Sequence, residues 1–392
     1  MSSGRRRLRW GAAVVAAGAL AALGWALLSQ SPEPDSGQTR ATLSVTEALG
    51  AGPEGYARAD RPRAFVFPDD HGPHPDFRTE WWYYTGNLET AGGRHFGFQL
   101  TFFSHALAPG PPPPGSAWRT TRVHFAHFAV TDTAARRFHA FARTGRPALG
   151  LAGARARPFR VWIDGWAAES DAPEALPVRL RAAEDGVAID LVLGSAKPVV
   201  LQGDRGLSAK GPEPGNASYY YSLTRMPARG TVTVMGERFE VAGLAWMDRE
   251  WSTSSLGRDL EGWDWFALQL DDGRELMVYR LRRRDGRPSP ESGGGLVDVG
   301  GAVRPLGAGD VAVEATGHWQ SPRSGARYPS GWRLYTGDLR LQVTPRLPDQ
   351  ELRVGPRYWE GAVTVRGSAG DRPVAGVGYV ELVGYAEASG RP

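Results

Sequence analysis

The stretch WWYYTGNL (Trp81–Leu88) recurs in altered form as WDWFALQL (Trp263–Leu270). Each copy is followed by a Gly-Arg turn, at Gly93-Arg94 and at Gly273-Arg274, and then by a second apolar segment. An aromatic hairpin that occurs twice, about 180 residues apart, indicates the duplication of a domain of that size. Because the match is short, two unrelated β-hairpins are the alternative.

The rest of the chain shows the period-two pattern of β-strands, with apolar residues at every second position of short blocks. Turn sequences such as Asp185-Gly186 and Asp272-Gly273 separate these blocks. The blocks that we expect to form strands include residues 123–130, 187–193, 231–234, 276–281, 339–343 and 363–365. No long segment of helical period follows residue 28. We therefore predict an all-β body of two antiparallel barrels in tandem, since closure removes exposed sheet edges.

Composition and charge exclude several classes of protein. Hydrophobic residues make up 41% of the 392 residues, which is enough to bury a core and excludes a disordered chain. The net charge is +4, but Arg5, Arg6, Arg7 and Arg9 carry four positive charges, so the body is balanced. We therefore expect no nucleic-acid partner. The absence of cysteine excludes disulfides, a cysteine nucleophile and a lipoprotein anchor.

The N-terminus has the pattern of an export signal or a membrane anchor. Basic residues Arg5–Arg9 precede an uncharged apolar stretch, Gly11–Leu28, which is near the minimum length for a membrane span. No Ala-x-Ala cleavage site follows it, so a cleaved signal and an uncleaved anchor in the inner membrane, formed by residues 10–28, both remain open. Arginines on the cytoplasmic side place the body in the periplasm or otherwise outside the cytoplasm.

The predicted organisation has four parts. Residues 1–28 form the signal or transmembrane helix, and residues 29–59, rich in Pro, Gly, Ser and Ala, form a linker. The first barrel then covers residues 60–240 and the second covers residues 241–390. Barrels of about eight strands are wide enough to hold one small ligand.

The run Trp246-Met247-Asp248-Arg249-Glu250-Trp251 places carboxylates among indoles, which is typical of a binding cleft or an active site. On a strand Asp248 and Glu250 share a face with Trp246. A carboxyl group held against indole can have a raised pKa and act as an acid. The alternative is that Asp248 and Glu250 form ion pairs with Arg249 and Arg258 where the two domains meet.

A metal or cofactor site is not expected. His124 and His127 are three positions apart on a predicted strand and so face opposite sides of it. His71 and His74 lie in a loop rich in Pro and Gly, where a structural role is the default. No nucleotide-binding or nucleophile-elbow motif is present.

Several longer motifs, in order, resemble the AttH/CrtC group, the carotenoid 1,2-hydratase-like proteins. They are Thr79–Leu88, His127–Asp132, Gly243–Trp251, Gly262–Phe266, Tyr358–Val363 and Gly378–Tyr385. The resemblance spans roughly residues 60 to 388. It implies two lipocalin-like barrels and a long apolar ligand such as a lipid, an isoprenoid or a polyketide. It also implies an association with ABC-transporter permeases in many bacterial members.

The resemblance also indicates which residues would have to carry out hydratase chemistry in this chain. Carotenoid hydratases add water to an isoprenoid double bond with a His-x-Trp pair and a Tyr-x-Asp pair. Trp251 and Tyr279 match these pairs, whereas Arg249 and Leu281 replace the histidine and the aspartate. Arginine cannot donate its proton in this pH range. A catalytic acid would therefore be Asp248 or Glu250, with Tyr279 beside it.

We expect the ligand to contact the aromatic and charged residues of the two repeats and the intervening run. These are Glu80, Trp81, Trp82, Tyr84, Trp246, Arg249, Trp251, Trp263 and Trp265. Asp264 alternates with Trp263 and Trp265, and should face solvent or the other domain if the two indoles point inward.

The predicted function is that of an extracytoplasmic, membrane-tethered protein that binds an apolar ligand and serves an ABC-type export system. One alternative is a hydro-lyase of the carotenoid 1,2-hydratase type, or a cyclisation catalyst for an isoprenoid or polyketide. Another is a structural partner of a permease with an empty barrel. A filled or narrow barrel core would argue against both the ligand-binding and the enzyme hypotheses.

Overall fold

The computed structural model describes residues 54–385 except residues 113, 117, 255, 258 and 356. The predicted N-terminal anchor and most of the linker therefore lie outside the described residues, and so does Arg258. Within residues 54–384, apart from the five omitted positions, helix is limited to the short 3-10 turns η1 (Asp69–His71) and η2 (Ala148–Gly150). The helices described here include none that could cross a membrane.

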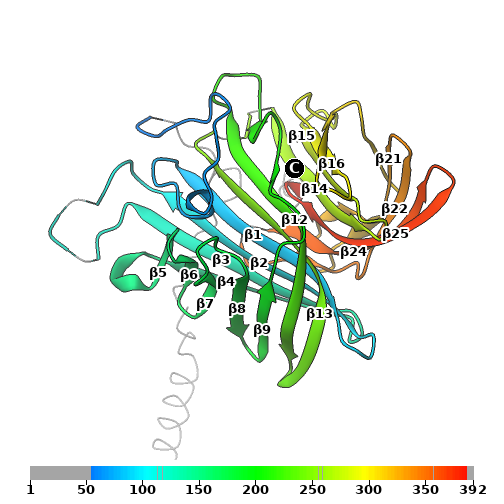
Figure 1. Ribbon diagram of the computed structural model, residues 1–392, viewed down its shortest axis with the longest axis horizontal. Helices are drawn as coiled ribbons and strands as arrows, with labels where there is room; N and C mark the ends of the chain where they lie inside the picture. Colours follow the sequence, from blue (N-terminus) through cyan, green and yellow to red (C-terminus); the bar gives the residue numbers. More distant parts are fainter. Residues whose placement is uncertain are drawn as a thin grey trace, which may run out of the picture. The chain divides into compact units, whose positions relative to one another are not determined.

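The first of two large antiparallel sheets contains thirteen strands, drawn from blue to green in Figure 1. They are β1 (Thr79–Glu89), β2 (His95–Ala106), β3 (Arg122–Asp132), β4 (Arg137–Gly145), β5 (Ala152–Arg155), β6 (Phe159–Ile163), β7 (Trp166–Ser170), β8 (Val178–Glu184), β9 (Val187–Leu193), β10 (Val200–Leu201), β11 (Leu207–Ala209), β12 (Ala217–Val234) and β13 (Glu237–Ser252).

The second sheet contains ten strands, drawn from yellow-green to red. They are β14 (Leu260–Leu270), β15 (Glu275–Arg283), β16 (Gly293–Val297), β17 (Val303–Gly307), β18 (Ala312–Ala315), β21 (Trp332–Thr336), β22 (Leu339–Pro345), β23 (Glu351–Leu352), β24 (Tyr358–Ala369) and β25 (Arg372–Leu382). A separate hairpin pairs β19 (His318–Gln320) with β20 (Arg327–Pro329). The all-β prediction is confirmed, and each alternating block is a strand or part of one.

The two sheets have the same strand order. The first runs β4-β3-β2-β1-β13-β12-β9-β8 and on to β5, and the second runs β17-β16-β15-β14-β25-β24-β22-β21-β18. Strands β1 and β14, which carry the two aromatic repeats, occupy the same place in this order. In each sheet the two edge strands, β4 and β5 or β17 and β18, are consecutive in the sequence. This shared topology supports the duplication inferred from the repeat.

The boundary between the sheets differs from the predicted one at residue 240. Strand β13 crosses that point and pairs with β1 and β12 along its length, so it belongs to the first sheet. The reason lies in the hairpin of β12 and β13, whose turn at Met235 precedes the predicted boundary. The first sheet therefore ends at Ser252 and the second begins at Leu260.

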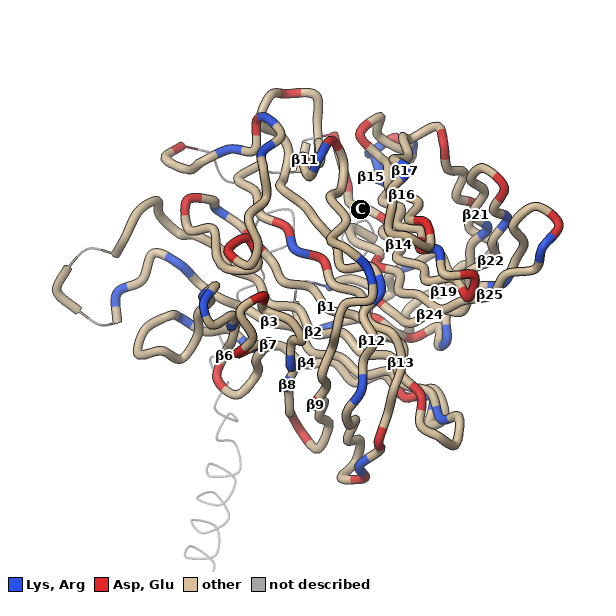
Figure 2. The backbone as a smooth tube through the Cα atoms, in the orientation of Figure 1, with Lys and Arg blue, Asp and Glu red and all other residues tan. Residues whose placement is uncertain are grey.

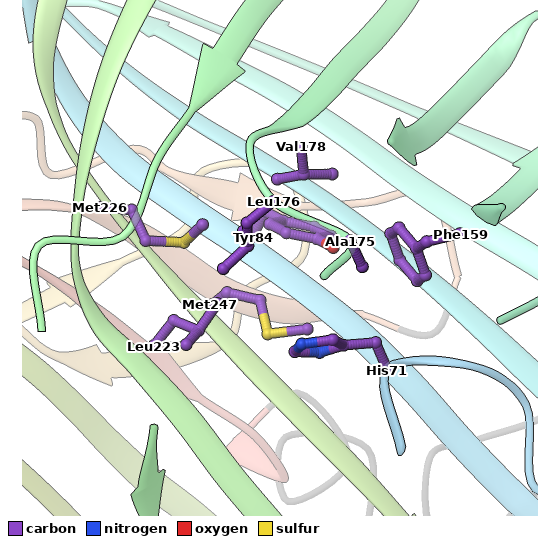
Figure 3. Close-up of a pocket in the computed structure, with 9 residues that line it drawn as sticks. All are labelled: His71, Tyr84, Phe159, Ala175, Leu176, Val178, Leu223, Met226 and Met247. Carbon is purple, nitrogen blue, oxygen red and sulfur yellow. The ribbon is translucent and has the colours of Figure 1, made fainter. Parts of the chain in front are cut away.

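Side chains fill the interior of the first sheet. Trp82, Tyr84 and Leu88 alternate along β1 and are fully buried in its core. The cavity shown in Figure 3 has a volume of about 10 Å³, which is room for about one water molecule. Its lining includes His71, Tyr84, Phe159, Ala175, Leu176, Val178, Leu223, Met226 and Met247. A ligand of isoprenoid size does not fit this interior as it stands.

Side-chain amides join the two sheets at equivalent positions of the repeat. Asn87 Nδ2 donates to the carbonyl oxygen of Gly378 on β25 (3.0 Å). Its counterpart, Gln269, donates from Nε2 to the carbonyls of Ala245 on β13 (2.9 Å) and Thr224 on β12 (2.8 Å). Both amides are buried. Each sheet thus holds the backbone of the other through one residue of its aromatic strand.

Replacing Gln269 by alanine should lower the free energy of unfolding by about 1–3 kcal/mol, because two buried carbonyls lose their donor. Urea unfolding followed by tryptophan fluorescence measures the change. Gln342→Ala, at an exposed position of β22, is the matched control and should shift the unfolding free energy by less than about 0.5 kcal/mol. Equal effects of the two changes would contradict this role for Gln269.

Candidate active site

The faces of the two sheets that meet are lined by aromatic side chains. Side chains alternate between the two faces of a strand, so Trp81 and Tyr83 lie on the face of β1 opposite to Trp82. For the same reason Trp263 and Trp265 lie together on one face of β14, opposite to Asp264. The Tyr83 and Trp265 rings meet edge to face across the two sheets, with centroids 5.2 Å apart. The cluster also contains Tyr220, Trp246, Ala267, Met277, Tyr279, Ala362 and Tyr379.

Asp248 projects from β13 into this aromatic cluster. Ser222 Oγ (2.5 Å) and Trp246 Nε1 (2.7 Å) donate to its Oδ1, and Tyr220 hydroxyl donates to its Oδ2 (2.7 Å). Burial raises the pKa of Asp248 to about 7, although these three donors oppose the rise. Trp246 and Asp248 thus share a face, as the strand period predicts.

Glu250, two residues further along β13, pairs with a lysine among the residues that the structure describes. The Lys210 ammonium lies 3.0 Å from Glu250 Oε1 and about 5 Å above the Tyr279 ring. Burial alone would lower the pKa of Lys210, but the neighbouring Glu250 carboxylate raises it above its ordinary value. Lys210 therefore stays charged and supplies one positive charge to the site.

Two more carboxyl groups come from the second sheet. Glu360 on β24 and Glu381 on β25 are directly opposite each other across the ladder. Tyr83 hydroxyl donates to Glu360 Oε1 (2.5 Å), and Trp263 Nε1 donates to Glu381 Oε2 (3.3 Å). Burial and the proximity of Glu381 raise the pKa of Glu360 well above its ordinary value. Burial also raises the pKa of Glu381, to about 7.

The acids of the two sheets occupy equivalent places in the duplicated fold. Asp248 is opposite Tyr83 in the ladder of β13 and β1. Glu381 is opposite Trp265 in the ladder of β25 and β14, where Trp265 is the repeat equivalent of Tyr83. The site therefore has two halves, each with a carboxyl group beside an aromatic strand.

The arrangement can hold and release protons near neutral pH. The site brings together Asp248, Glu250, Glu360 and Glu381, and Asp248 and Glu250 both raise the pKa of Glu381. One lysine cannot neutralise all four carboxyl groups, and Asp248, Glu360 and Glu381, whose pKa values are raised, keep their protons to a higher pH than exposed carboxyl groups do. The neighbouring indole and phenol faces can stabilise a cationic intermediate.

An aromatic row leads away from the acids along the first sheet. Trp81, Phe103 and Phe125 are opposite one another on β1, β2 and β3, and all three are only partly buried. The Phe103 and Phe125 rings stack with centroids 4.4 Å apart. Glu381 and Trp263 are also partly exposed. These four aromatic side chains and Glu381 are therefore partly accessible to solvent.

The structure divides the predicted site residues into two groups. The facing surfaces bring together Trp81, Trp246, Asp248, Glu250, Trp263, Trp265 and Tyr279. The other five predicted residues, Glu80, Trp82, Tyr84, Arg249 and Trp251, are buried on the opposite face of β1 and β13, within the first sheet.

A buried ion pair organises that second group. Arg249 Nη2 donates to Glu80 Oε2 (2.6 Å), and its guanidinium lies 3.9 Å from the centroid of the Trp82 ring. His74 stacks on Trp251 with centroids 3.7 Å apart. Burial would raise the pKa of Glu80, but Arg249, His74 and Arg122 lower it to about 2. The network fastens the segment before β1 to the first sheet.

The placement of Asp264 corrects the prediction that it faces solvent or the other domain. Asp264 is buried on the second sheet, with Arg282 Nε at 3.1 Å and the Tyr385 hydroxyl donating to it at 2.9 Å. Trp263 and Trp265 point toward the other sheet, so Asp264 points into its own.

Sequence reasoning missed Tyr83, Lys210, Tyr220, Glu360 and Glu381 as site residues. The repeat itself contained one signal, because extending its alignment through the paired strands equates Glu381 with Asp248. Lys210 had no such signal, since it comes from a loop beside β11. In the part of the chain that the structure describes, no three His, Asp or Glu side chains converge in a metal-binding cluster.

Asp248→Asn should change how stability depends on pH. The folded state holds a proton on Asp248 up to about pH 7, whereas the unfolded state releases it near pH 4. Proton binding by Asp248 therefore stabilises the folded state below about pH 4. The free energy of unfolding then falls by up to about 1.4 kcal/mol for each pH unit as the pH rises from 4 to 7. Unfolding free energies measured from pH 4 to 8 should therefore fall less steeply for the variant.

The control is Asp371→Asn at an exposed turn, which should follow the wild-type pH dependence. A wild-type slope in the Asp248 variant would show that this group does not hold the proton.

Comparisons with known proteins agree with this fold. The model of the AttH-like family matches residues 58–385. The crystal structure of an AttH protein from Nitrosomonas europaea is 36% identical and has a TM-score of 0.74, covering 84% of this chain and 99% of that one.

A hydratase is among the more distant relatives. Kievitone hydratase of Fusarium solani subsp. phaseoli is 25% identical over 219 residues, which are 52% of this chain and 59% of the relative. The chain thus aligns with less than two thirds of that protein. The crystal structure of kievitone hydratase from Nectria haematococca, 16% identical, shares the fold with a TM-score of 0.64 over 84% of this chain and 95% of that one.

Proposed function

Because the chain belongs to the AttH-like family, we propose that its two facing sheets bind an apolar, unsaturated molecule and add water to a carbon–carbon double bond or remove it. The observation that carries this proposal is the set of four carboxyl groups beside indole rings, of which Asp248, Glu250 and Glu360 are buried. A protein that only binds an apolar ligand gains nothing from buried carboxyl groups, which are unfavourable unless they are protonated or paired. Kievitone hydratase supports the same class of chemistry.

Glu381 is the group best placed to protonate a ligand. It is partly exposed, and Trp263 donates to its Oε2, which leaves Oε1 for a ligand. In the proposed step the π electrons of the alkene form a C–H bond with the Glu381 proton. The carbocation that results is stabilised by the faces of Trp263 and Trp265. Water then adds to the cation and returns a proton to the carboxylate, so that alkene and water give an alcohol.

The aromatic row of Trp81, Phe103 and Phe125 would hold the apolar body of the ligand. This arrangement retains the predicted apolar ligand, a lipid, an isoprenoid or a polyketide, but moves it from a barrel interior to the surfaces between the sheets. The filled core of the first sheet argues against binding inside that sheet.

Location and partners are proposed from the sequence. The basic Arg5–Arg9 and apolar Gly11–Leu28 segments support tethering of the body outside the cytoplasm at the inner membrane. A role beside an ABC-type exporter rests on the family resemblance.

The full-length protein incubated with kievitone, or with the isoprenoid polyene squalene, in water enriched in ¹⁸O tests the proposal. Mass spectrometry should detect a product heavier by one water that carries ¹⁸O. A change in tryptophan fluorescence reports binding separately. Binding of both probes without any ¹⁸O uptake would favour a carrier function, and no binding would contradict the proposed site.

A further inference from the structure

Exposed apolar side chains gather at one end of the first sheet. Of the eight large hydrophobic residues most exposed in the described chain, six belong to segments that enter or leave β1 to β5 at that end. These six are Val66, Phe67, Leu107, Trp118, Leu149 and Leu151. The ladders of β1 with β2 and of β3 with β4 place the three segments together, since Thr79 pairs with His105 and His124 with Gly145. Met235 lies at the opposite end, near Arg137.

Two of the loops at this end are also basic. Residues 107–121 and 146–158 contain Arg119, Arg146, Arg155 and Arg157 and no Asp or Glu. Figure 2 shows blue and no red on the loop between β2 and β3. Arg157 pairs with Asp69, which leaves three arginines in these loops to add positive charge. Apolar side chains combined with arginine are typical of surfaces that bind anionic lipid.

The start of the described chain lies at the same end. Gly55 is in contact with Pro109 of the β2–β3 loop, and residues 1–53 precede it with the apolar stretch Gly11–Leu28. The chain thus enters the first sheet beside the most exposed apolar loop, where Leu107 is 61% and Trp118 is 62% exposed. The residues that precede the described chain therefore join the body at the end that carries this loop.

We propose that this end of the first sheet docks onto an anionic phospholipid bilayer, with Leu107 and Trp118 entering the headgroup region. Tryptophan prefers this depth of a membrane because its ring is apolar and its N–H is polar. The partly exposed Trp81, Phe103 and Phe125 lie near the same end, since they are close to the ends of β1, β2 and β3. An apolar ligand would then enter the site from the lipid phase, an extension that rests on the proposed function.

The absence of cysteine allows a direct test. Trp118→Cys in the full-length protein is labelled with an environment-sensitive nitrobenzoxadiazole group and mixed with vesicles of phosphatidylcholine and phosphatidylglycerol. The label emission should shift to the blue and be quenched by a nitroxide on the lipid chain. Met235→Cys, carrying the same label at the opposite end, should show neither change. Leu107→Cys should behave like Trp118→Cys.

The test separates docking from tethering and from catalysis. Vesicles of phosphatidylcholine alone should give a smaller shift at position 118, because the arginines lose their anionic partners. If the protein sediments with vesicles while both labels stay in water, the tether alone holds it and the proposal is overturned. Failure to associate with the vesicles also overturns it. The labels report docking whether or not water is added to any ligand.

Discussion

Arg249→Met is expected to destabilise the protein by about 3–5 kcal/mol, because it leaves Glu80 buried without its closest cation. Arg249 is fully buried and Glu80 is 1% exposed, and their side chains meet at 2.6 Å. The guanidinium also donates to the carbonyl of Gly72 at 2.6 Å. Urea unfolding of the variant measures the change. A protease should also cleave the segment before β1 faster in the variant than in the wild-type protein.

Two controls separate the effect of burying the ion pair from the effect of leaving one charge without a partner. Arg179→Met removes an exposed ion pair with Asp190 and should cost less than about 1 kcal/mol. The double variant Glu80→Gln/Arg249→Met should be more stable than Arg249→Met, since no uncompensated carboxylate remains. An Arg249 variant as stable as the Arg179 variant would contradict this account.

The same ion pair should be sensitive to acid. The folded pKa of Glu80 is about 2, below its ordinary value. Its contribution to stability is therefore present above about pH 4 and is lost as the pH falls toward 2.

Glu381→Gln is expected to lower the rate of water addition at least about 100-fold, the lower range for loss of a general acid. Glutamine keeps the size of the side chain and can still accept from Trp263, so ligand binding should change little. The ¹⁸O assay measures turnover, and tryptophan fluorescence measures binding. Glu237→Gln, at an exposed position of β13, should leave both unchanged. Full turnover by the Glu381 variant would assign the acid to another carboxyl group.

The position of the hydratase-like histidine has a structural explanation here. Arg249, which the sequence resemblance matches to that histidine, is buried inside the first sheet with Glu80, on the face of β13 that points away from Asp248. The acids of this site instead come from the face shared by Trp246 and Asp248 and from the second sheet.

Period two and the repeat were sufficient to predict the all-β fold and the duplication. They could not decide which face of β1 meets the other sheet, because both faces are buried. Trp82 and Trp81 are adjacent in the sequence, yet Trp82 packs in the first sheet and Trp81 lines the site. Glu360 and Glu381 were missed because only tertiary packing brings them to Tyr83 and Trp263, more than a hundred residues away.

The amides of Asn87 and Gln269 bind backbone carbonyls of the opposite sheet, and this has a consequence for how the family can evolve. Every amino acid offers a carbonyl, so substitutions at Ala245 or Thr224 that preserve the backbone leave the bonds of Gln269 available. At Gly378 any side chain would meet the Ala267 carbonyl, so this position is held to glycine. Substitutions of residues that line the site therefore leave intact the hydrogen bonds by which Asn87 and Gln269 join the two sheets. A lineage can exchange one ligand for another while the joint between the ancestral copies persists.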